Sequence, residues 1–454
     1  MRCCSVVLVL LSIAGPPSVA AEPGSPAAPD LVVPIDWPRF DSGIDLDSDC
    51  RQCGDLLRNC AAYILQWIPK TFEENPSQRM YVLTRMEEHG IRPSTSSVYA
   101  LAALIATRAF DVAAIGLSQE EALERTIKLL RGVAATHKVH RANAEGWGDC
   151  WQSALWAAQL GFGGWMLWDR LDQDTRELLV PLVVHEADRF IDYKVPYSNE
   201  NKKDTKAEEN SWNSMILNVA VAMMPRHPHV TQWKRKCSEL MVSSYATEKD
   251  WRENTKVLDG KPVCQWLAGF NAFEGGIVYN HGFLHPDYMV AETMSLWAYI
   301  AQSLAGGPVP ETADFNGAMI YRTLVTRDFP SPPFEAPGGA VYKPGQASVY
   351  YPRGVDWSTY DLSLYYLIDV WAHVLGWDKS LPQQAKSWMR LRAPKMLEMQ
   401  QRHEDRRMFA KGEYDTYEGA EQLAMWCIAD AYFALWLNAH HALSPTGNWL
   451  APGS

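Results

Sequence analysis

Two histidines and two tyrosines are gathered in one Gly-rich segment of the chain, residues 273–288. Imidazoles titrate near neutral pH and phenols transfer protons in suitable surroundings, so His281 and Tyr288 are candidates for moving protons. A simple turn does not need so many titratable groups, which indicates a functional site. The segment also contains a Glu and an Asp, and its side chains Tyr279, Asn280 and His285 can form hydrogen bonds or ring contacts beside them.

A second candidate group lies at residues 206–213, where an apolar helix is predicted to begin. Asn210 and Asn213 are three residues apart and therefore share a helix face, with Trp212 beside them. The positive end of a helix and its free N–H groups favour an anion. The structural alternative is an ordinary acidic first turn with an Asn cap.

Two further segments combine aromatic and polar residues. Arg353 lies in the segment 350–357, and its guanidinium can hold a carboxylate through two parallel hydrogen bonds. The alternative is a surface arginine stacked on Tyr or Trp. In residues 143–152, Trp147 and Trp151 are compatible with a sugar-binding platform and equally with helix packing.

Several classes of site are absent from the sequence or weakly indicated. It contains no Gly-rich phosphate loop, no Gly-x-Ser-x-Gly elbow and no His-Glu-x-x-His zinc motif. Cys50, Cys53 and Cys60 lack the second pair that a zinc knuckle needs, so a local disulfide or free buried thiols are the alternatives. We expect no required cofactor and no catalytic metal, while a structural divalent metal remains compatible with the sequence.

The composition is that of a folded acidic protein. The 454 residues are 47% hydrophobic and 21% charged, with 19 Trp and a formal net charge of −11. Because an acidic protein repels phosphate backbones, nucleic acid is not an expected partner. An anionic substrate would need positive groups local to the site.

The N-terminus is typical of an exported protein. Arg2 precedes the apolar stretch 6–14 and the small residues Ser18-Val19-Ala20, which predicts a signal peptide over residues 1–20. Residues 21–45 are predicted to form an extended tether, and residues 46–454 a single domain. Since no later apolar run reaches the length of a membrane span, we expect a secreted or periplasmic protein without one.

Apolar residues recur at helical spacing along most of the chain, which predicts an all-α fold. The segments Ser118–Glu121 and Ser380–Gln383 read as capping boxes, Asp172 marks another start, and Pro181 is a candidate kink. Residues 338–351 predict a small β-hairpin, and the stretches 194–208, 247–287 and 327–357 are long irregular loops. The predicted helices span residues 51–69, 76–89, 95–110, 119–136, 150–170, 173–193, 209–224, 229–246, 288–305, 315–326, 358–376, 381–404 and 416–442.

Such helices in antiparallel pairs are compatible with an α/α toroid of about six helical hairpins. The segments Glu-Glu-Asn-Ser-Trp-Asn (208–213) and Asn-His-Gly-Phe-Leu-His-Pro-Asp-Tyr (280–288) resemble those of the rhamnose–glucuronate lyases. These belong to the α/α-toroid polysaccharide lyases, a group that includes heparinase II/III-like enzymes. The layout is similar over residues 80–440, but the chain lacks room for the C-terminal β-sandwich of the larger heparinase-type enzymes.

The resemblance implies β-elimination in an anionic glycan that contains uronic acid. It implies that an Asn neutralises the carboxylate and that a His/Tyr set moves the protons, here Asn210 with Arg353, and His281 with Tyr288. The remaining substrate contacts are then expected from Trp212, Asn213, Tyr279, Asn280, His285, Trp147 and Tyr350.

Two other functions fit the same sequence. A glycoside hydrolase needs two carboxyl groups, for which Glu208 or Glu209 with Asp287 or Glu274 are candidates. A non-catalytic carbohydrate-binding protein would keep the aromatic platforms and tolerate the loss of His281.

Overall fold

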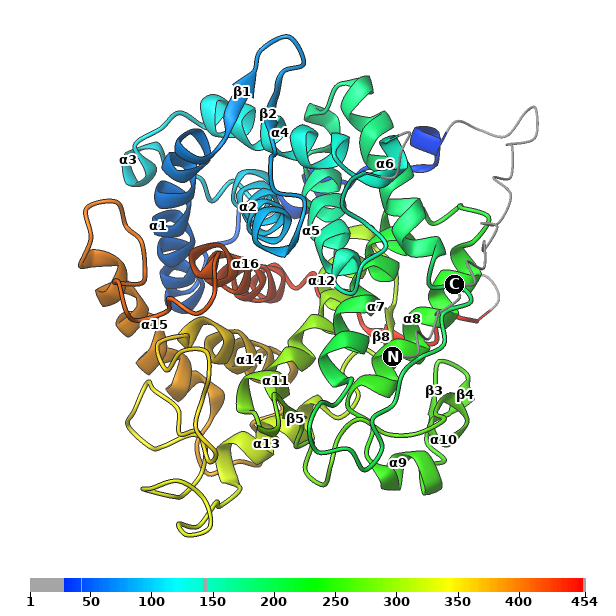
Figure 1. Ribbon diagram of the computed structural model, residues 1–454, viewed down its shortest axis with the longest axis vertical. Helices are drawn as coiled ribbons and strands as arrows, with labels where there is room; N and C mark the ends of the chain where they lie inside the picture. The colour runs from blue at the N-terminus through cyan, green and yellow to red at the C-terminus, as the bar shows by residue number, and fades with distance from the viewer. Residues whose placement is uncertain (1–27, 42, 142–144, 452–454) are drawn as a thin grey trace, which may run out of the picture.

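Helices fill most of the computed structural model, which describes residues 28–41, 43–141 and 145–451 (Figure 1). The predicted signal peptide, residues 1–20, lies outside the described residues. Within them, the strands form four two-stranded sheets and no barrel. The expected mostly helical architecture is confirmed.

The α-helices are α1 (Ser48–Thr71), α2 (Glu88–Ala106), α3 (Val112–Ile115), α4 (Gln119–Ala135), α5 (Ser153–Met166), α6 (Gln173–Asp188), α7 (Ala207–Met223), α8 (Val230–Ser244), α9 (Glu248–Glu253), α10 (Val263–Trp266), α11 (Pro286–Val290), α12 (Trp297–Ala305), α13 (Gly317–Thr326), α14 (Leu362–Leu375), α15 (Ala385–Gln401) and α16 (Ala420–Ala439). The 3-10 helices are η1 (Ala28–Leu31), η2 (Trp37–Phe40), η3 (Lys138–His140), η4 (Trp168–Arg170) and η5 (Ala291–Met294).

The strands are β1 (Glu73–Asn75), β2 (Met80–Val82), β3 (Val257–Leu258), β4 (Lys261–Pro262), β5 (Tyr279–Asn280), β6 (Phe283–Leu284), β7 (Val309–Pro310) and β8 (Thr446–Gly447). The pairs β1–β2, β3–β4 and β5–β6 are antiparallel, whereas β7 and β8 run parallel.

The most apolar helices form the interior. All residues of α5 are buried, and so are nearly all of α16, because apolar side chains surround both helices. Helix α16 packs against α1, α2, α12 and α14, while α5 packs against α2, α6 and α7. A large hydrophobic cluster joins these helices, and a second, small one lies around β3, β4 and α10.

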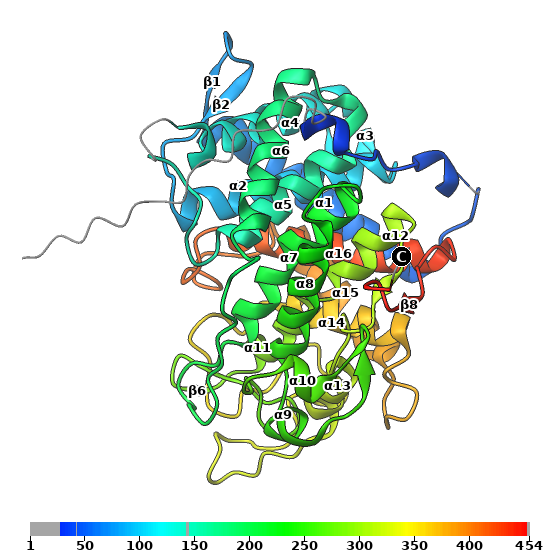
Figure 2. The ribbon, with the colours of Figure 1, turned by 90° about the vertical axis from the view of Figure 1, so that its right-hand side faces the viewer.

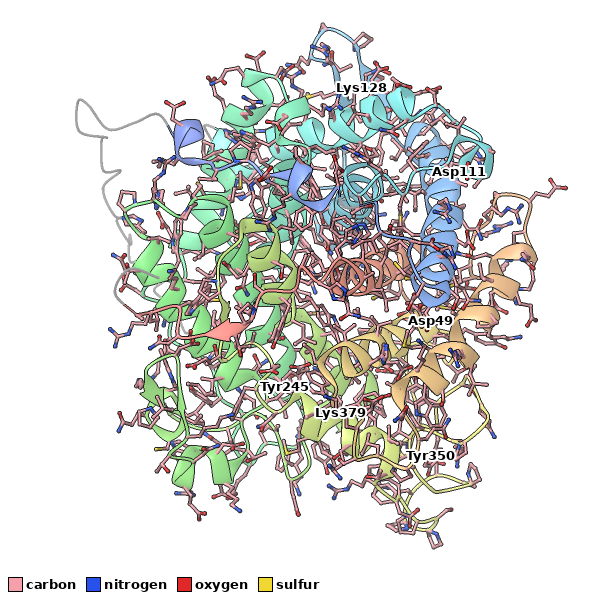
Figure 3. All side chains as sticks on the ribbon, turned by 180° about the vertical axis from the view of Figure 1, so that it is seen from behind. Asp49, Asp111, Lys128, Tyr245, Tyr350 and Lys379 are labelled. Carbon is pink, nitrogen blue, oxygen red and sulfur yellow. The ribbon has the colours of Figure 1, made fainter. Side chains whose placement is uncertain are left out.

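Amphipathic helices cover this interior. Helix α4 buries Leu129, Leu130 and Val133 and packs on α2. Its exposed side carries Lys128, whose Nζ lies 2.7 Å from Glu74 Oε1 on β1; Figure 3 labels Lys128 in a view from behind. Such partly exposed ion pairs contribute little stability compared with the apolar face.

Two of the predicted helix starts are confirmed and one is wrong. The Ser118 hydroxyl accepts a hydrogen bond from Glu121 N, and the Asp172 carboxylate accepts one from Thr175 N. Helix α6 continues through Pro181 as one element. The expected start at Ser380 is incorrect, because α15 begins at Ala385 and the Ser380 hydroxyl instead accepts a hydrogen bond from Arg322.

The predicted helix 76–89 is wrong, since the chain forms the hairpin β1–β2 there. The Asn75 side chain accepts hydrogen bonds from Ser77 Oγ and Gln78 N, which closes the turn after β1. Tyr81 and Leu83 are both buried and Val82 between them is exposed, a spacing of two that suits a strand. Packing of β2 on α4 thus prevails over local helix propensity.

Two other predicted elements differ in extent. The predicted helix 288–305 is divided into α11, η5 and α12. The predicted hairpin at 338–351 is reduced to one antiparallel bridge between Tyr342 and Val349.

Residues 28–41, part of the expected tether, pack on the helices. Val32, Ile35 and Phe40 are buried, and Val33 N donates to Met223 O of α7. The seven described cysteines are free thiols, so of the two alternatives for Cys50, Cys53 and Cys60 the structure has the free buried thiols and not a local disulfide. Within the described ranges, none of the helices combines the length and the apolar character needed to cross a membrane.

Candidate functional site

The hairpin β5–β6 and helix α11 present the histidine-rich segment between α7 and α14 (Figure 1). Figure 2 shows β6 on the face that Figure 1 turns to the viewer, with β8 on the opposite side. His281 and Gly282 form the turn, and both have positive φ, 53° and 92°. The Asn280 side chain stabilises this unusual backbone by accepting a hydrogen bond from His281 N.

Backbone hydrogen bonds attach this hairpin to the loop before α7. Thr205 N donates to Tyr279 O and Gly282 N donates to Lys203 O. Helix α11 then begins at Pro286, a residue whose fixed φ suits the first helical position. His281 and Tyr288 are therefore held on a short, well-anchored unit.

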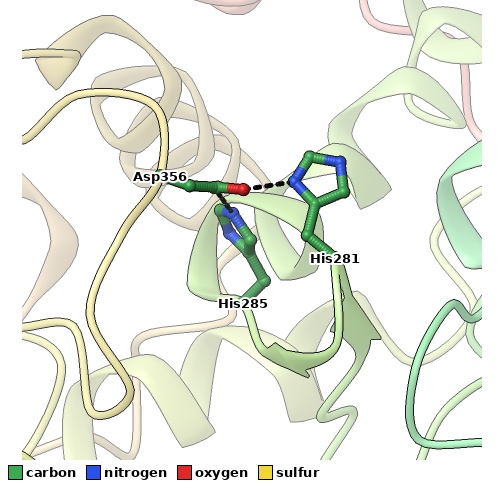
Figure 4. Close-up of side chains that lie close together, drawn as sticks. All are labelled: His281, His285 and Asp356. Carbon is green, nitrogen blue, oxygen red and sulfur yellow. Dashed lines mark hydrogen bonds and ion pairs between the residues drawn. The ribbon is translucent and has the colours of Figure 1, made fainter.

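A chain of hydrogen bonds joins Tyr288, His281 and Asp356. The Tyr288 hydroxyl lies 3.1 Å from His281 Nε2, and His281 Nδ1 lies 2.6 Å from Asp356 Oδ2. His285 Nε2 contacts the other oxygen, Asp356 Oδ1, at 3.0 Å (Figure 4). If Asp356 is ionised, both imidazoles donate to it, and His281 Nε2 is then free to accept from the Tyr288 hydroxyl.

Aromatic rings extend from this group across the same region. The Trp357 ring lies 5.4 Å from the Tyr288 ring and 6.0 Å from that of Tyr417. The guanidinium of Arg92 on α2 lies 4.0 Å from the centre of the Tyr417 ring. Arg92 also donates to Gln152 and pairs with Glu88, so a cation and an aromatic wall adjoin the Tyr–His–Asp chain.

Burial and neighbouring charges set the protonation of the group. Burial lowers the pKa of His285 to about 4, although Asp356 opposes the shift, so this imidazole is neutral at pH 7. Partial burial raises the pKa of Asp356, but hydrogen bonds from His285 and His281 outweigh it and lower the pKa below its ordinary value. Burial, followed by the charges of Glu208 and Asp356, raises the pKa of Tyr288.

Glu208 differs from the other acidic residues of the first turn of α7. Burial, followed by the charge of Glu209, raises the pKa of Glu208 well above its ordinary value, while Arg92 partly opposes the shift. The charge of Glu208 raises the pKa of Tyr288, and the charge of Arg92 lowers the pKa of Glu208. Glu208, in the first turn of α7, is therefore an acid whose protonated form is favoured.

Asn210 and Arg353 are not joined to this group by any hydrogen bond or ion pair among the described residues. The Asn210 amide is fully buried and donates to Pro196 O and to Ser243 Oγ of α8. Arg353 is exposed; it donates to Pro333 O and its guanidinium lies 4.7 Å from the centre of the Phe334 ring. Both side chains hold neighbouring loops or helices together.

The other residues predicted from sequence divide between the site and the interior. Tyr279, Asn280 and His285 belong to the hairpin unit that carries His281. Trp147 is buried and donates to Val133 O, whereas Tyr350 is buried and donates to Glu335 O. Trp212 and Asn213 are buried in α7, but Trp212 contacts the exposed Trp151 with ring centres 5.1 Å apart.

Sequence reasoning missed Asp356, Trp357 and Arg92 as members of the site. Asp356 and Trp357 lie in the same aromatic segment as Arg353, which was the residue singled out. The segment itself was a signal, because it combines aromatic and polar residues, but nothing in it links Asp356 to His281. No spacing rule connects position 92 to position 281.

Among the described residues, two groups of histidine and carboxylate side chains could hold a metal ion. One is His281, His285 and Asp356, and the other is Asp149, His185 and Glu186. In each group the potential ligand atoms lie within 4.8 Å of one another.

No protein-family model, curated protein or solved structure matches this chain.

Proposed function

We propose that the protein is a polysaccharide lyase that cleaves a uronic-acid-containing glycan by β-elimination. The observation that supports this most strongly is the hydrogen-bonded chain from Tyr288 through His281 to Asp356. A phenol beside an imidazole that a carboxylate orients is suited to transferring protons. The adjoining rings of Trp357 and Tyr417 offer apolar faces of the kind that pack on sugars.

We further propose that the helices form an α/α toroid. Helix α2 packs on α5, α5 on α7 and α7 on α12, while α12 and α14 both pack on α16, which returns to α2. This closed succession is what the inner layer of a toroid requires. Helices α1, α4, α6, α8 and α15 pack on its outside, and the hairpin β5–β6, which carries His281, lies on the face that Figure 1 turns to the viewer (Figure 2).

The reaction breaks the C4–O4 bond of the uronic acid. The Tyr288 hydroxyl gives its proton to Nε2 of His281, and the phenolate so formed removes the proton from C5. The C5–H electron pair becomes the C4=C5 double bond, and the C4–O4 electron pair leaves with O4. The leaving oxygen then takes a proton from the same Tyr–His pair, so no water is consumed. His281 holds the Tyr288 oxygen through Nε2 and is itself oriented by Asp356.

Charge on the substrate carboxylate must be neutralised before C5 becomes acidic enough. Because Asn210 and Arg353 are engaged elsewhere, we no longer assign them this role. Arg92 is a cation on the aromatic wall, and protonated Glu208 can donate a hydrogen bond to a carboxylate. The substrate is thus proposed to lie between α2 and α11.

A glycoside hydrolase is less well supported by the same residues. Of the four carboxyl groups named for it, Glu209 pairs with Lys206, and Asp287 is buried and accepts hydrogen bonds from Tyr351 and Tyr365. Glu274 lies in the loop before β5, where its backbone carbonyl accepts a hydrogen bond from Arg327. Glu208 is left without a named partner, whereas hydrolysis needs two carboxyl groups.

The test is to incubate the exported form of the protein with a panel of uronic-acid glycans. A lyase gives products with a carbon–carbon double bond, seen by ultraviolet absorption and mass spectrometry. In water labelled with heavy oxygen, a hydrolase incorporates the label into the new reducing end and a lyase does not. Saturated, labelled products, or binding without turnover over the whole panel, would refute the proposal.

A further inference from the structure

The two imidazoles and the carboxylate beside Tyr288 form a set of metal ligands. We propose that His281 Nδ1, His285 Nε2 and the Asp356 carboxylate bind one divalent transition-metal ion of the zinc type (Figure 4). Imidazole nitrogen and carboxylate oxygen are ligands that zinc accepts, and catalytic zinc sites use three protein ligands and leave one position open. This proposal replaces the expectation from the sequence that the protein has no catalytic metal.

The ligand atoms already face one another. His281 Nδ1 and His285 Nε2 lie 2.6 and 3.0 Å from the two oxygens of Asp356, so both nitrogens point toward the same carboxylate. Zinc–nitrogen and zinc–oxygen bonds are about 2.0–2.2 Å long, so a small outward movement of Asp356 makes room for the ion. Asp356 and His281 are each about two-fifths exposed, at 42% and 40%, which leaves the open position accessible from solvent.

The second nitrogen of each histidine has the surroundings of a metal ligand. A ligating histidine usually directs its other nitrogen to a carboxylate or another hydrogen-bonding group. His281 Nε2 faces the Tyr288 hydroxyl at 3.1 Å, and His285 Nδ1 lies 3.8 Å from Asp287 Oδ2. His285 is fully buried and its Nδ1 has no hydrogen bond, so the metal-free tautomer leaves this atom unsatisfied. With the ion on Nε2, the proton moves to Nδ1 and faces Asp287.

Charge distinguishes this group from the other histidine–carboxylate group of the protein. Asp149 pairs with Lys138 at 2.8 Å and Glu186 pairs with Arg189 at 2.7 Å, so cationic side chains already neutralise those carboxylates. Within the described ranges, Asp356 pairs only with the two histidines. A divalent cation fits the first group and is disfavoured in the second.

The role of the ion, though not its binding, rests on the proposed lyase function. An ion with an open position can bind a carboxylate oxygen of the uronic acid and withdraw charge from it. An ion on Nδ1 takes the place of the Nδ1 proton, so the imidazole carries its proton on Nε2 and donates it to the Tyr288 oxygen, which stabilises the phenolate that removes the C5 proton. This supplies the positive charge that neither Asn210 nor Arg353 provides.

Metal binding can be measured on the full chain without any substrate. The purified protein is analysed for bound elements, stripped with a chelator, and titrated calorimetrically with Zn²⁺, with Ca²⁺ and Mn²⁺ as comparisons. We expect one Zn²⁺ per chain. The variants His281→Gln and Asp356→Asn change partly exposed side chains, and each should weaken binding by more than the roughly 10–100-fold cost of losing an outer partner.

His185→Gln is the matched control, because it removes a histidine from the second group; it should bind Zn²⁺ like the unchanged protein. Absence of a stoichiometric Zn²⁺ site, or equal affinity in Asp356→Asn, would overturn the metal site. If the stripped protein turns over glycan at the full rate, the catalytic role of the ion fails and the lyase stands. If Zn²⁺ binds but no glycan is cleaved, the lyase fails and the metal site stands.

Discussion

The hydroxyl of Tyr288 lies 3.1 Å from Nε2 of His281, on the side of the imidazole opposite to Asp356. The two residues are seven positions apart, one in the β5–β6 turn and the other in α11. Tyr288 is mostly buried and contacts Trp357, so its hydroxyl has a fixed direction.

Replacing Tyr288 by Phe should abolish most turnover while keeping the fold. The phenyl ring retains the contacts with Trp357 and His285, but the proton-transferring oxygen is lost. We expect kcat to fall by roughly 10²–10⁴-fold with a much smaller change in KM. Steady-state kinetics on the cleaved glycan, with circular dichroism to confirm folding, measures this. Full activity of Tyr288→Phe would exclude the tyrosine from the chemistry.

The sequence was sufficient to place His281 and Tyr288 in one site because local structure determines their relationship. A Gly-containing turn followed by Pro286 predicts a short connection into a helix, which keeps both side chains on one unit. The partner Asp356 lies 75 positions from His281, and only the packing of the 351–361 loop brings it there. Single-sequence patterns contain no information on such a pairing.

Asn210, Arg353 and residues 76–89 were predicted incorrectly for the same reason, because their surroundings are set by the packing of the folded chain. Asn210 does begin an apolar helix, but the side of α7 that it occupies faces α8 rather than α11. Arg353 and Asp356 are only three positions apart, yet the loop turns one side chain to Phe334 and the other to His281. Residues 76–89 have an acceptable helical composition, and only contact with α4 makes them a hairpin.

Arg353→Ala and Asn210→Ala should therefore have different effects. Arg353 is exposed and its hydrogen bond to Pro333 O is a surface contact, so we expect activity within about threefold of the unchanged protein and a stability change near 0.5 kcal/mol or less. Loss of the Asn210 amide removes its two buried hydrogen bonds, to Pro196 O and Ser243 Oγ, which at about 0.5–1.5 kcal/mol each should cost about 1–3 kcal/mol of unfolding free energy.

Denaturant unfolding and glycan kinetics on both variants make this comparison. A loss of kcat in Arg353→Ala as large as in Tyr288→Phe would show that the arginine acts in the active site. An Asn210→Ala protein that is fully stable but inactive would show that the asparagine acts there too.

Trp151 and Trp212 lie side by side, but we expect Trp151 to contribute to substrate binding and Trp212 to stability. Trp151 is 55% exposed, so Trp151→Ala should leave stability almost unchanged and raise KM about five- to tenfold, or about 1–1.4 kcal/mol, if sugar packs on it. Trp212 is buried, and Trp212→Ala should cost about 3–5 kcal/mol of stability through the cavity it creates. Kinetics and thermal unfolding test both, and an unchanged KM in Trp151→Ala would remove it from the substrate path.

Asp430 of α16 should make the protein less stable as the pH rises. It is fully buried between Tyr99 of α2 and Trp297 of α12, which contact its two oxygens at 2.6 Å each. Burial raises its pKa from 3.8 to about 7, with the hydrogen bonds from Tyr99 and Trp297 opposing the shift. Between these values the folded state retains a proton that the unfolded state releases. The free energy of unfolding should therefore fall with pH by up to about 1.4 kcal/mol per unit, and become independent of this group above pH 7.

Asp430→Asn tests this because an amide imitates the protonated acid: its oxygen can accept from Trp297 and its NH₂ can donate to the Tyr99 oxygen. The variant should be more stable than the unchanged protein at pH 8, and the advantage should shrink as the pH approaches 4. Urea unfolding at several pH values measures the difference, with the exposed Asp169→Asn as a control that should track the unchanged protein. The opposite trend, with Asp430→Asn losing stability relative to the unchanged protein as the pH rises, would mean that the ionised carboxylate is the form that holds these three helices together.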